Sequence, residues 1–149
     1  LGGTLSTSWA LLNLDTNKAK VSFDGTKKVD GKESYLLSYT PKGGGDIDVR
    51  LYFEKDTFRH FRTEYKRVSS AGIGLRPEDS TKFSESRLKV TEDFSDFKEE
   101  GGITLPHSYR IYYSVTGQNG TTEIEWTSIL SEFAINQPLD STTFDPAAE

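Results

Sequence analysis

The sequence predicts a mainly β fold with minor α content: a curved antiparallel sheet, shaped as a half-open β-barrel, with one or two short helices. Apolar and polar residues alternate through residues 35–40, 46–53, 108–115 and 123–128. Alternation with a period of two is typical of strands that bury one face and expose the other. Turn signals separate these runs at intervals of about ten residues, which favours a meander of neighbouring strands.

Eight strands are expected, and the residues between them suit tight turns. Asp24-Gly25, Asp30-Gly31 and Asn119-Gly120 each fit a two-residue hairpin, because Gly and Asn accept the positive φ angles that the favoured turns need. Asn119 also begins a glycosylation sequon, although the hairpin explains this Asn better. The expected strands span 20–24, 26–30, 33–41, 46–54, 57–68, 83–98, 103–116 and 121–135.

Two features predict departures from regular strand geometry. The run Asp93–Phe97 breaks strict alternation and predicts a β-bulge. Pro106 has no backbone N–H to donate, so it is expected at a strand edge or a bulge.

Helix is expected at two places. Ser6 or Thr7 can cap a short helix, and Pro77 can open a helical turn within the long connection 69–82. The first helix would carry four apolar side chains, Trp9, Leu11, Leu12 and Leu14.

Length and composition bound the class of protein. The 149 residues fit one domain, with a helical or irregular N-terminal segment at 1–18 and an antiparallel meander at 19–145. The chain has no Met, even at position 1, which predicts a piece of a longer protein. The absence of Cys excludes disulfides and thiol chemistry. No apolar run approaches the ~20 residues of a transmembrane segment, and a net charge of −5 argues against a nucleic-acid partner.

Catalytic motifs are sparse, so the sequence predicts a protein that is not an enzyme and uses no cofactor and no metal. His60 falls in the polar phase of its strand and is expected to face solvent, and His107 is expected at a strand start. Neither spacing matches a metal-binding motif, and the glycines at 43–45 precede no helix that could complete a phosphate loop. The acidic run 92–100 is interpreted as a solvated face, with a carboxylate pair for glycoside hydrolysis as the alternative.

An aromatic-rich sheet face with little helix to cover it is the feature that points to function. Matching phases on successive strands predict that six apolar residues share one concave face, and that Ile73 and Leu75 in the connection 69–82 form its gate. Three coverings are open: the sheet closes on itself, a region upstream packs on it, or it holds a hydrophobic ligand. The simplest interpretation is that Trp9, Leu11 and Leu12 form an ordinary core with this face, together with the loop 70–82. The six residues are Val49, Leu51, Ile111, Tyr113, Ile124 and Trp126.

Four segments resemble the lipoprotein-sorting proteins of the bacterial outer membrane, the LolA/LolB-like superfamily. Residues 25–37 resemble that family's Gly–Val–Gly–Tyr–Leu hairpin, and residues 51–58 resemble its Leu-Tyr-Phe strand and turn. Residues 93–106 are similar to its Phe-x-Asp signature followed by Leu-Pro, and residues 133–144 are similar to its closing Asn-x-Pro-Leu-Asp tail. The family's first helix and earliest strands have no clear counterpart here, and no Arg matches the one that locks the closed carrier.

The resemblance implies a half-barrel in the periplasm or cell envelope of a Gram-negative bacterium, able to hold lipoprotein acyl chains. We therefore expect a non-catalytic envelope protein that binds a lipid or a lipoprotein acyl chain, with peripheral rather than transmembrane contact to the membrane. The alternative is a scaffold or protein-interaction module of a larger envelope protein, with no ligand of its own.

Overall fold

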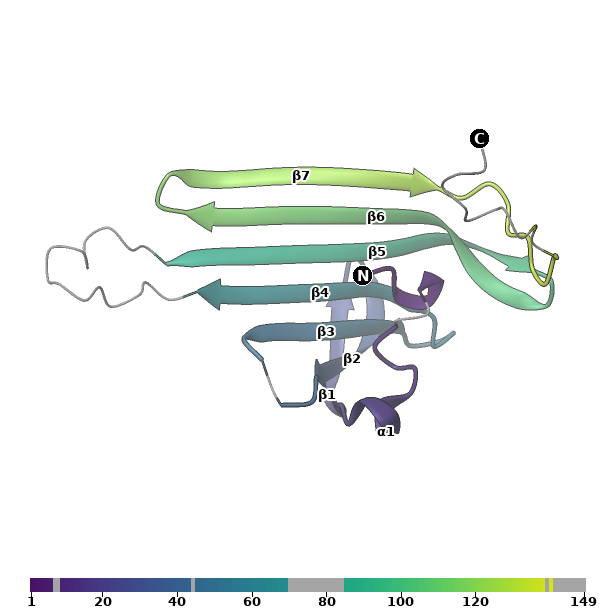
Figure 1. The fold of residues 1–149 in the computed structure, drawn as a ribbon, viewed down its shortest axis with the longest axis horizontal. Coiled ribbons are helices and arrows are strands. Elements are labelled where there is room, and N and C mark those ends of the chain that lie inside the picture. Colours follow the sequence, from purple (N-terminus) through teal and green to yellow (C-terminus); the bar gives the residue numbers. More distant parts are fainter. Residues whose placement is uncertain (7–8, 44, 70–84, 139, 141–149) are drawn as a thin grey trace, which may run out of the picture.

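A computed structural model describes residues 1–6, 9–43, 45–69, 85–138 and 140, and confirms the predicted fold class. Seven antiparallel strands follow one another in sequence order as a single curved sheet, which β1 and β7 leave unclosed (Figure 1). Strands account for 64% of the described residues. The elements are η1 (Gly3–Leu5), α1 (Leu14–Asn17), β1 (Lys20–Val29), β2 (Lys32–Thr40), β3 (Ile47–Glu54), β4 (His60–Ser69), β5 (Ser86–Glu100), β6 (Ile103–Gly117) and β7 (Gly120–Ile129).

The predicted Asp24-Gly25 hairpin is wrong, because these two residues form a bulge inside the single strand β1. The pairing of β1 with β2 shifts by one residue between Phe23 and Thr26. Gly25 takes a φ of 93° there, and the Asp24 carboxylate accepts hydrogen bonds from Ser22 and Ser38. Asp-Gly serves a turn and a bulge equally well, since both need a residue with positive φ.

The predicted bulge at Asp93–Phe97 is also wrong, since β5 and β6 keep one register on both sides of it. Asp96 instead takes a left-handed φ of 51° without adding a residue. The second bulge lies in β4, where the register shifts between Tyr52 and Phe53 and Phe61 is the extra residue. Pro106 lies beyond the end of the β6–β7 ladder, where β6 is locally an edge.

The expected N-terminal helix does not form over Trp9 to Leu12. Those residues make turns, and α1 begins only at Leu14 because Asn13 has a left-handed φ of 57°. The second expected helix, in the connection 69–82, falls almost wholly outside the described residues. The last strand is shorter than expected: β7 ends at Ile129, and the following residues are irregular.

The two faces of the sheet differ in composition. We call the face that carries Leu51, Tyr113 and Trp126 the apolar face, and the face that carries Arg62, Asp93 and Arg110 the charged face. Residues opposite each other in an antiparallel ladder lie on the same face, so the register assigns every strand residue to one of the two.

The β1–β2 hairpin curls toward the charged face. Its Val29 packs there with Leu36, Tyr52 and Phe61 in the hydrophobic core cluster, and Figure 1 shows the hairpin running behind the sheet. At this end, the predicted concavity of the apolar face is therefore wrong, because β1 and β2 bend away from that face. The bulge in β1 and the extra residue in β4 supply the local bend.

The N-terminal segment covers part of the apolar face. The Gly2 amide donates to the Glu92 carboxylate at 2.5 Å, and the Trp9 ring lies 5.5 Å from the His60 ring. Gly3 is buried against Phe94, and a Cβ at Gly3 would lie only 2.4 Å from the end of that ring. The approach of this segment to β4 and β5 therefore depends on a residue without a side chain.

Candidate functional site on the apolar face

All six residues predicted to share a face do so. Ile111 pairs with Trp126, and Tyr113 pairs with Ile124. Val49 and Leu51 reach the same face through their partners Tyr65 and Thr63 on β4. The face is buried at β3, where Leu51 is 1% exposed. Its exposure to solvent is greater at β7, where Trp126 is 51% exposed. The predicted gate residues Ile73 and Leu75 lie outside the described residues.

One row of side chains crosses the whole apolar face and alternates between aliphatic and tyrosine residues. Each member is the register partner of the next, so the row runs perpendicular to all seven strands. With strands ~4.8 Å apart, it is about 29 Å long. We call it the Val–Tyr row: Val21, Tyr39, Val49, Tyr65, Val90, Tyr113 and Ile124.

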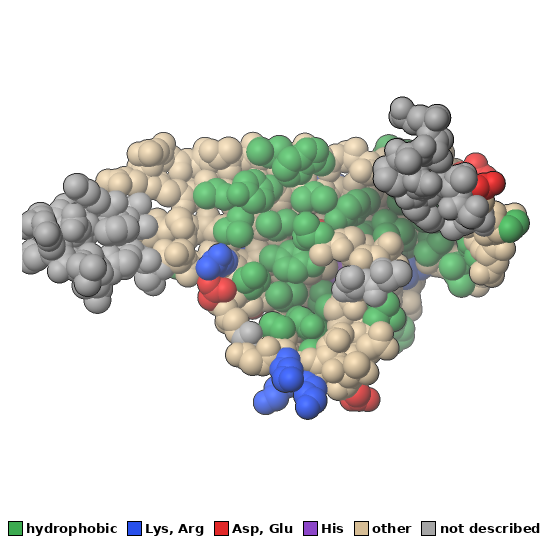
Figure 2. Space-filling model, viewed as in Figure 1, with side chains coloured by type: hydrophobic (Ala, Val, Ile, Leu, Met, Phe, Trp, Pro, Cys, Tyr) green, Lys and Arg blue, Asp and Glu red, His purple; other side chains and the backbone are tan. Residues whose placement is uncertain are grey.

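Cross-strand pairs of an aromatic with a β-branched residue each stabilise a sheet by roughly 0.2–1 kcal/mol. The row therefore contributes to folding, while most of its members keep partial exposure. Figure 2 shows the result as a field of hydrophobic side chains over the sheet, with charged side chains at its margins. The sequence alone does not place Tyr65 and Val90 on this face, because only the register connects the phases of β4 and β5 to those of the other strands.

An apolar pocket of about 350 Å³ lies at the β1–β3 end of the same face. Phe23 opposes Leu37, and Tyr35 opposes Phe53, so these four side chains reach it from three adjacent strands. Leu11 of the N-terminal segment and Phe58 of the β3–β4 turn complete the lining. The lining contains no charged side chain, which suits a hydrophobic guest.

Phe58 is held in a strained conformation that places its ring in this pocket. Its φ is 57°, which is unfavourable for a residue with a Cβ. The ring stacks on Tyr35 with centroids 5.7 Å apart and planes 14° apart, yet Phe58 remains 68% exposed. Strain of this kind persists where the surroundings fix it, and it gathers at functional sites.

Glu92 is the only carboxylate on the apolar face that the structure describes as fully buried. Tyr65 donates to its Oε2 at 2.8 Å, Tyr109 donates to its Oε1, and the Gly2 amide supplies a third hydrogen bond. Burial raises the pKa of both tyrosine hydroxyls above their ordinary value, and Glu92 raises it further through its charge and its hydrogen bonds to them. Both oxygens are thus occupied, which keeps the carboxylate in a structural role rather than free for proton transfer.

His60 is not solvent-facing as predicted, since it is 3% exposed on the apolar face. The extra residue Phe61 shifts the phase of β4, so His60 pairs with Phe53 instead of pointing outward. Its Nε2 lies 2.9 Å from the Thr63 hydroxyl. Burial lowers the pKa of His60 from 6.5 to about 4, so the ring is neutral at pH 7.

His107 lies inside β6 rather than at its start and is 3% exposed. Its Nε2 contacts the Glu100 carboxylate at 2.9 Å, and its ring meets Phe133 edge-on. The Leu130 amide donates to the His107 carbonyl at 2.8 Å. His107 thus anchors the chain that follows β7.

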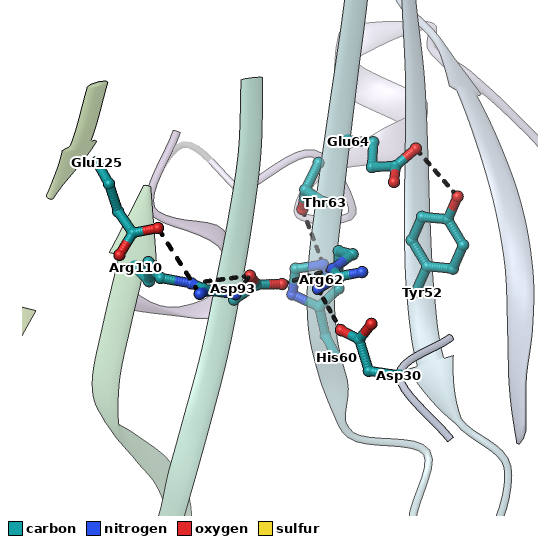
Figure 3. A network of polar contacts seen from close by, with 9 residues as sticks. All are labelled: Asp30, Tyr52, His60, Arg62, Thr63, Glu64, Asp93, Arg110 and Glu125. Atoms are coloured by element: carbon teal, nitrogen blue, oxygen red, sulfur yellow. Dashed lines mark hydrogen bonds and ion pairs between the residues drawn. The ribbon is translucent and has the colours of Figure 1, made fainter. Parts of the chain in front are cut away.

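The charged face carries a chain of ion pairs that ties the strands together (Figure 3). Arg62 bridges Asp30 at 2.6 Å and also contacts Asp93, and Arg110 joins Asp93 at 2.6 Å to Glu125 at 3.7 Å. Burial alone would lower the pKa of Arg62, but Asp93 and Asp30 raise it. This chain holds the β1–β2 turn against β4 and leaves the apolar face free of the pairs.

Among the described residues, no group of three or more His, Cys, Asp and Glu side chains is placed to hold a metal ion. Within the same part of the chain, no helix has the length and hydropathy to cross a membrane.

The fold and this site define a single curved antiparallel sheet with an open apolar face. Comparison with known proteins found no matching family model, curated sequence or solved structure. The function of this chain is therefore inferred from the geometry of the apolar face.

Proposed function

We propose that this chain is a non-catalytic protein of the cell envelope that binds a lipid or a lipoprotein acyl chain on its apolar face. The observation that carries the proposal is the apolar pocket lined by Phe23, Tyr35, Leu37 and Phe53 beside the Val–Tyr row. The row extends the apolar surface toward Ile124, so a chain that starts in the pocket can continue across the sheet. The resemblance to lipoprotein-sorting proteins supports the compartment.

The energetics suit a flexible apolar ligand. Each buried methylene contributes about 0.8 kcal/mol, and ten would give roughly 8 kcal/mol before the costs of ordering both partners. The pocket is largely formed, because Tyr35 is already packed by Phe23 and Phe58. Preformed packing reduces the free-energy cost of ordering, so more of the free energy of burial contributes to affinity.

The test is titration with cis-parinaric acid, a fluorescent fatty acid. Leu37→Glu places a carboxylate in the pocket, and Trp126→Glu places one at the open end of the face. Thr127→Glu is the matched control, since Thr127 follows Trp126 in β7 but lies on the opposite, charged face. We expect saturable binding that Leu37→Glu weakens at least tenfold, Trp126→Glu weakens less, and Thr127→Glu leaves unchanged.

Absence of saturable binding by the unmodified protein would overturn the proposal and leave the scaffold interpretation. Equal loss of affinity in Trp126→Glu and Thr127→Glu would also contradict it, because the ligand would then not distinguish the two faces. Circular dichroism of each variant separates a loss of binding from a loss of fold.

A further inference from the structure

The two edges of the sheet are built differently. β1 carries Lys20, Lys27 and Lys28 and is interrupted by the bulge after Phe23. Lysines and bulges are the usual means of preventing an edge strand from pairing with another chain. β7 has no Lys, Arg or Pro, keeps one register along its length, and is exposed at all ten residues. One edge is therefore protected, and the other is suited to pairing.

The open side of β7 offers a regular ladder of backbone groups. Gly117 and Gly120 flank the two-residue turn, and such a pair exchanges both of its hydrogen bonds. Alternation from that pair directs the backbone of the even-numbered residues toward β6 and that of the odd-numbered residues toward the open edge. No described segment pairs with that edge, which ends the sheet.

The side chains of β7 define what would fit beside it. Ile124 and Trp126 are exposed on the apolar face, at 41% and 51%. Glu123 and Glu125 project on the charged face, and the nearest cation to Glu125 is Arg110 at 3.7 Å, which already pairs more closely with Asp93. A neighbouring strand would therefore gain from apolar residues on one face and basic residues on the other.

We propose that the β7 edge accepts an extended segment of a partner protein as an eighth strand, with Lys or Arg alternating with aliphatic residues. Strand addition of this type takes affinity from backbone hydrogen bonds and specificity from alternate side chains. A second copy of this chain fits less well, because pairing β7 with β7 gathers Glu123 and Glu125 of both copies on one face. The proposal is independent of the apolar ligand.

The experiment uses Trp126 as the reporter in a Trp9→Phe background, where it is the sole tryptophan. The probe is a blocked nine-residue peptide that alternates Lys or Arg with Val, and the control peptide carries Glu in place of each basic residue. We expect a saturable change in Trp126 emission with the basic peptide and at least tenfold weaker binding of the acidic one.

Two variants make the result decisive. Glu123→Lys combined with Glu125→Lys changes only exposed side chains and should reverse the preference between the peptides. Thr127→Pro removes an N–H that points to the open edge. It should weaken binding of the basic peptide at least tenfold while the circular dichroism spectrum stays unchanged. Equal affinity for both peptides, or a preference that the double variant does not alter, would overturn the proposal. A dimer in sedimentation velocity that Thr127→Pro abolishes would instead assign the edge to a second copy.

Discussion

Tyr65 on β4 donates its phenolic hydrogen to Glu92 on β5 across 2.8 Å, although its register partner is Val90. The diagonal contact lets one tyrosine serve two purposes. Its ring continues the Val–Tyr row, and its hydroxyl satisfies a carboxylate that is fully buried. The apolar face thus stays open, while its one fully buried carboxylate in the described chain accepts hydrogen bonds on both oxygens.

Replacement of Glu92 tests that arrangement. Glu92→Ala leaves the Tyr65 and Tyr109 hydroxyls without their acceptor and should lower the free energy of unfolding by about 2–4 kcal/mol. Glu92→Gln keeps an acceptor oxygen and should cost about half as much. Urea denaturation measures both, and an alanine variant as stable as the unmodified protein would show that the network contributes nothing.

His60 makes stability depend on pH. Its pKa in the folded protein is about 4, below the ordinary 6.5, so between these values the unfolded chain binds a proton that the folded chain does not. Stability should therefore fall by up to ~3 kcal/mol as the pH is lowered from 6.5 to 4. His60→Asn should flatten this slope above pH 4.5, where the carboxylates remain charged. A slope unchanged by the substitution would contradict burial of a neutral ring.

Leu51 and Trp126 lie on the same face but should differ in their effect on stability. Leu51 is 1% exposed, so Leu51→Ala should cost about 2–5 kcal/mol. Trp126 is half exposed, and Trp126→Ala should cost only about 1 kcal/mol, well below the ~3–5 kcal/mol of a packed core. Guanidinium denaturation compares the two, and a cost for Trp126 as large as that for Leu51 would show that the β7 end is closed.

Phe58 should show opposite effects on stability and binding. Phe58→Gly relieves the left-handed φ at a position that is largely exposed, so the variant should be as stable as the parent or more stable by up to ~1 kcal/mol. It also removes one wall of the apolar pocket and should weaken the binding of cis-parinaric acid at least threefold. Thermal unfolding and the fluorescence titration are run on the same preparation, and tighter binding would exclude Phe58 from the site.

The sequence predicted the sheet and the shared face because one phase of β3, β6 and β7 is strongly apolar. Ile111, Ile124 and Trp126 each sit between more polar neighbours, and the period of two fixes their face. Pairing of Ile111 with Trp126 is set by the turn at Gln118-Asn119, between the paired residues Gly117 and Gly120. The predicted Asn119-Gly120 turn is therefore wrong by one residue, but this shift leaves Ile111 and Trp126 on the same face.

The features that the sequence does not predict depend on contacts between residues that lie far apart in the chain. Phe61 looks like one more apolar strand residue, and only the register with β3 shows that it is inserted and turns His60 inward. Glu92 lies in an acidic run that suggests a solvated face, and only the positions of Tyr65 and Tyr109 explain its burial. The apolar pocket likewise needs Leu11 and Phe58, which lie outside every strand.

The central claim, that the apolar face holds a hydrophobic chain, is tested most directly by NMR with a spin-labelled stearic acid. Leu36 and Leu37 are neighbours on β2 that point to opposite faces. We predict that substoichiometric ligand broadens the methyl signals of Leu37, Val90 and Ile124 and spares those of Leu36 and Val29. Equal broadening of Leu36 and Leu37, or none at either, would contradict the account.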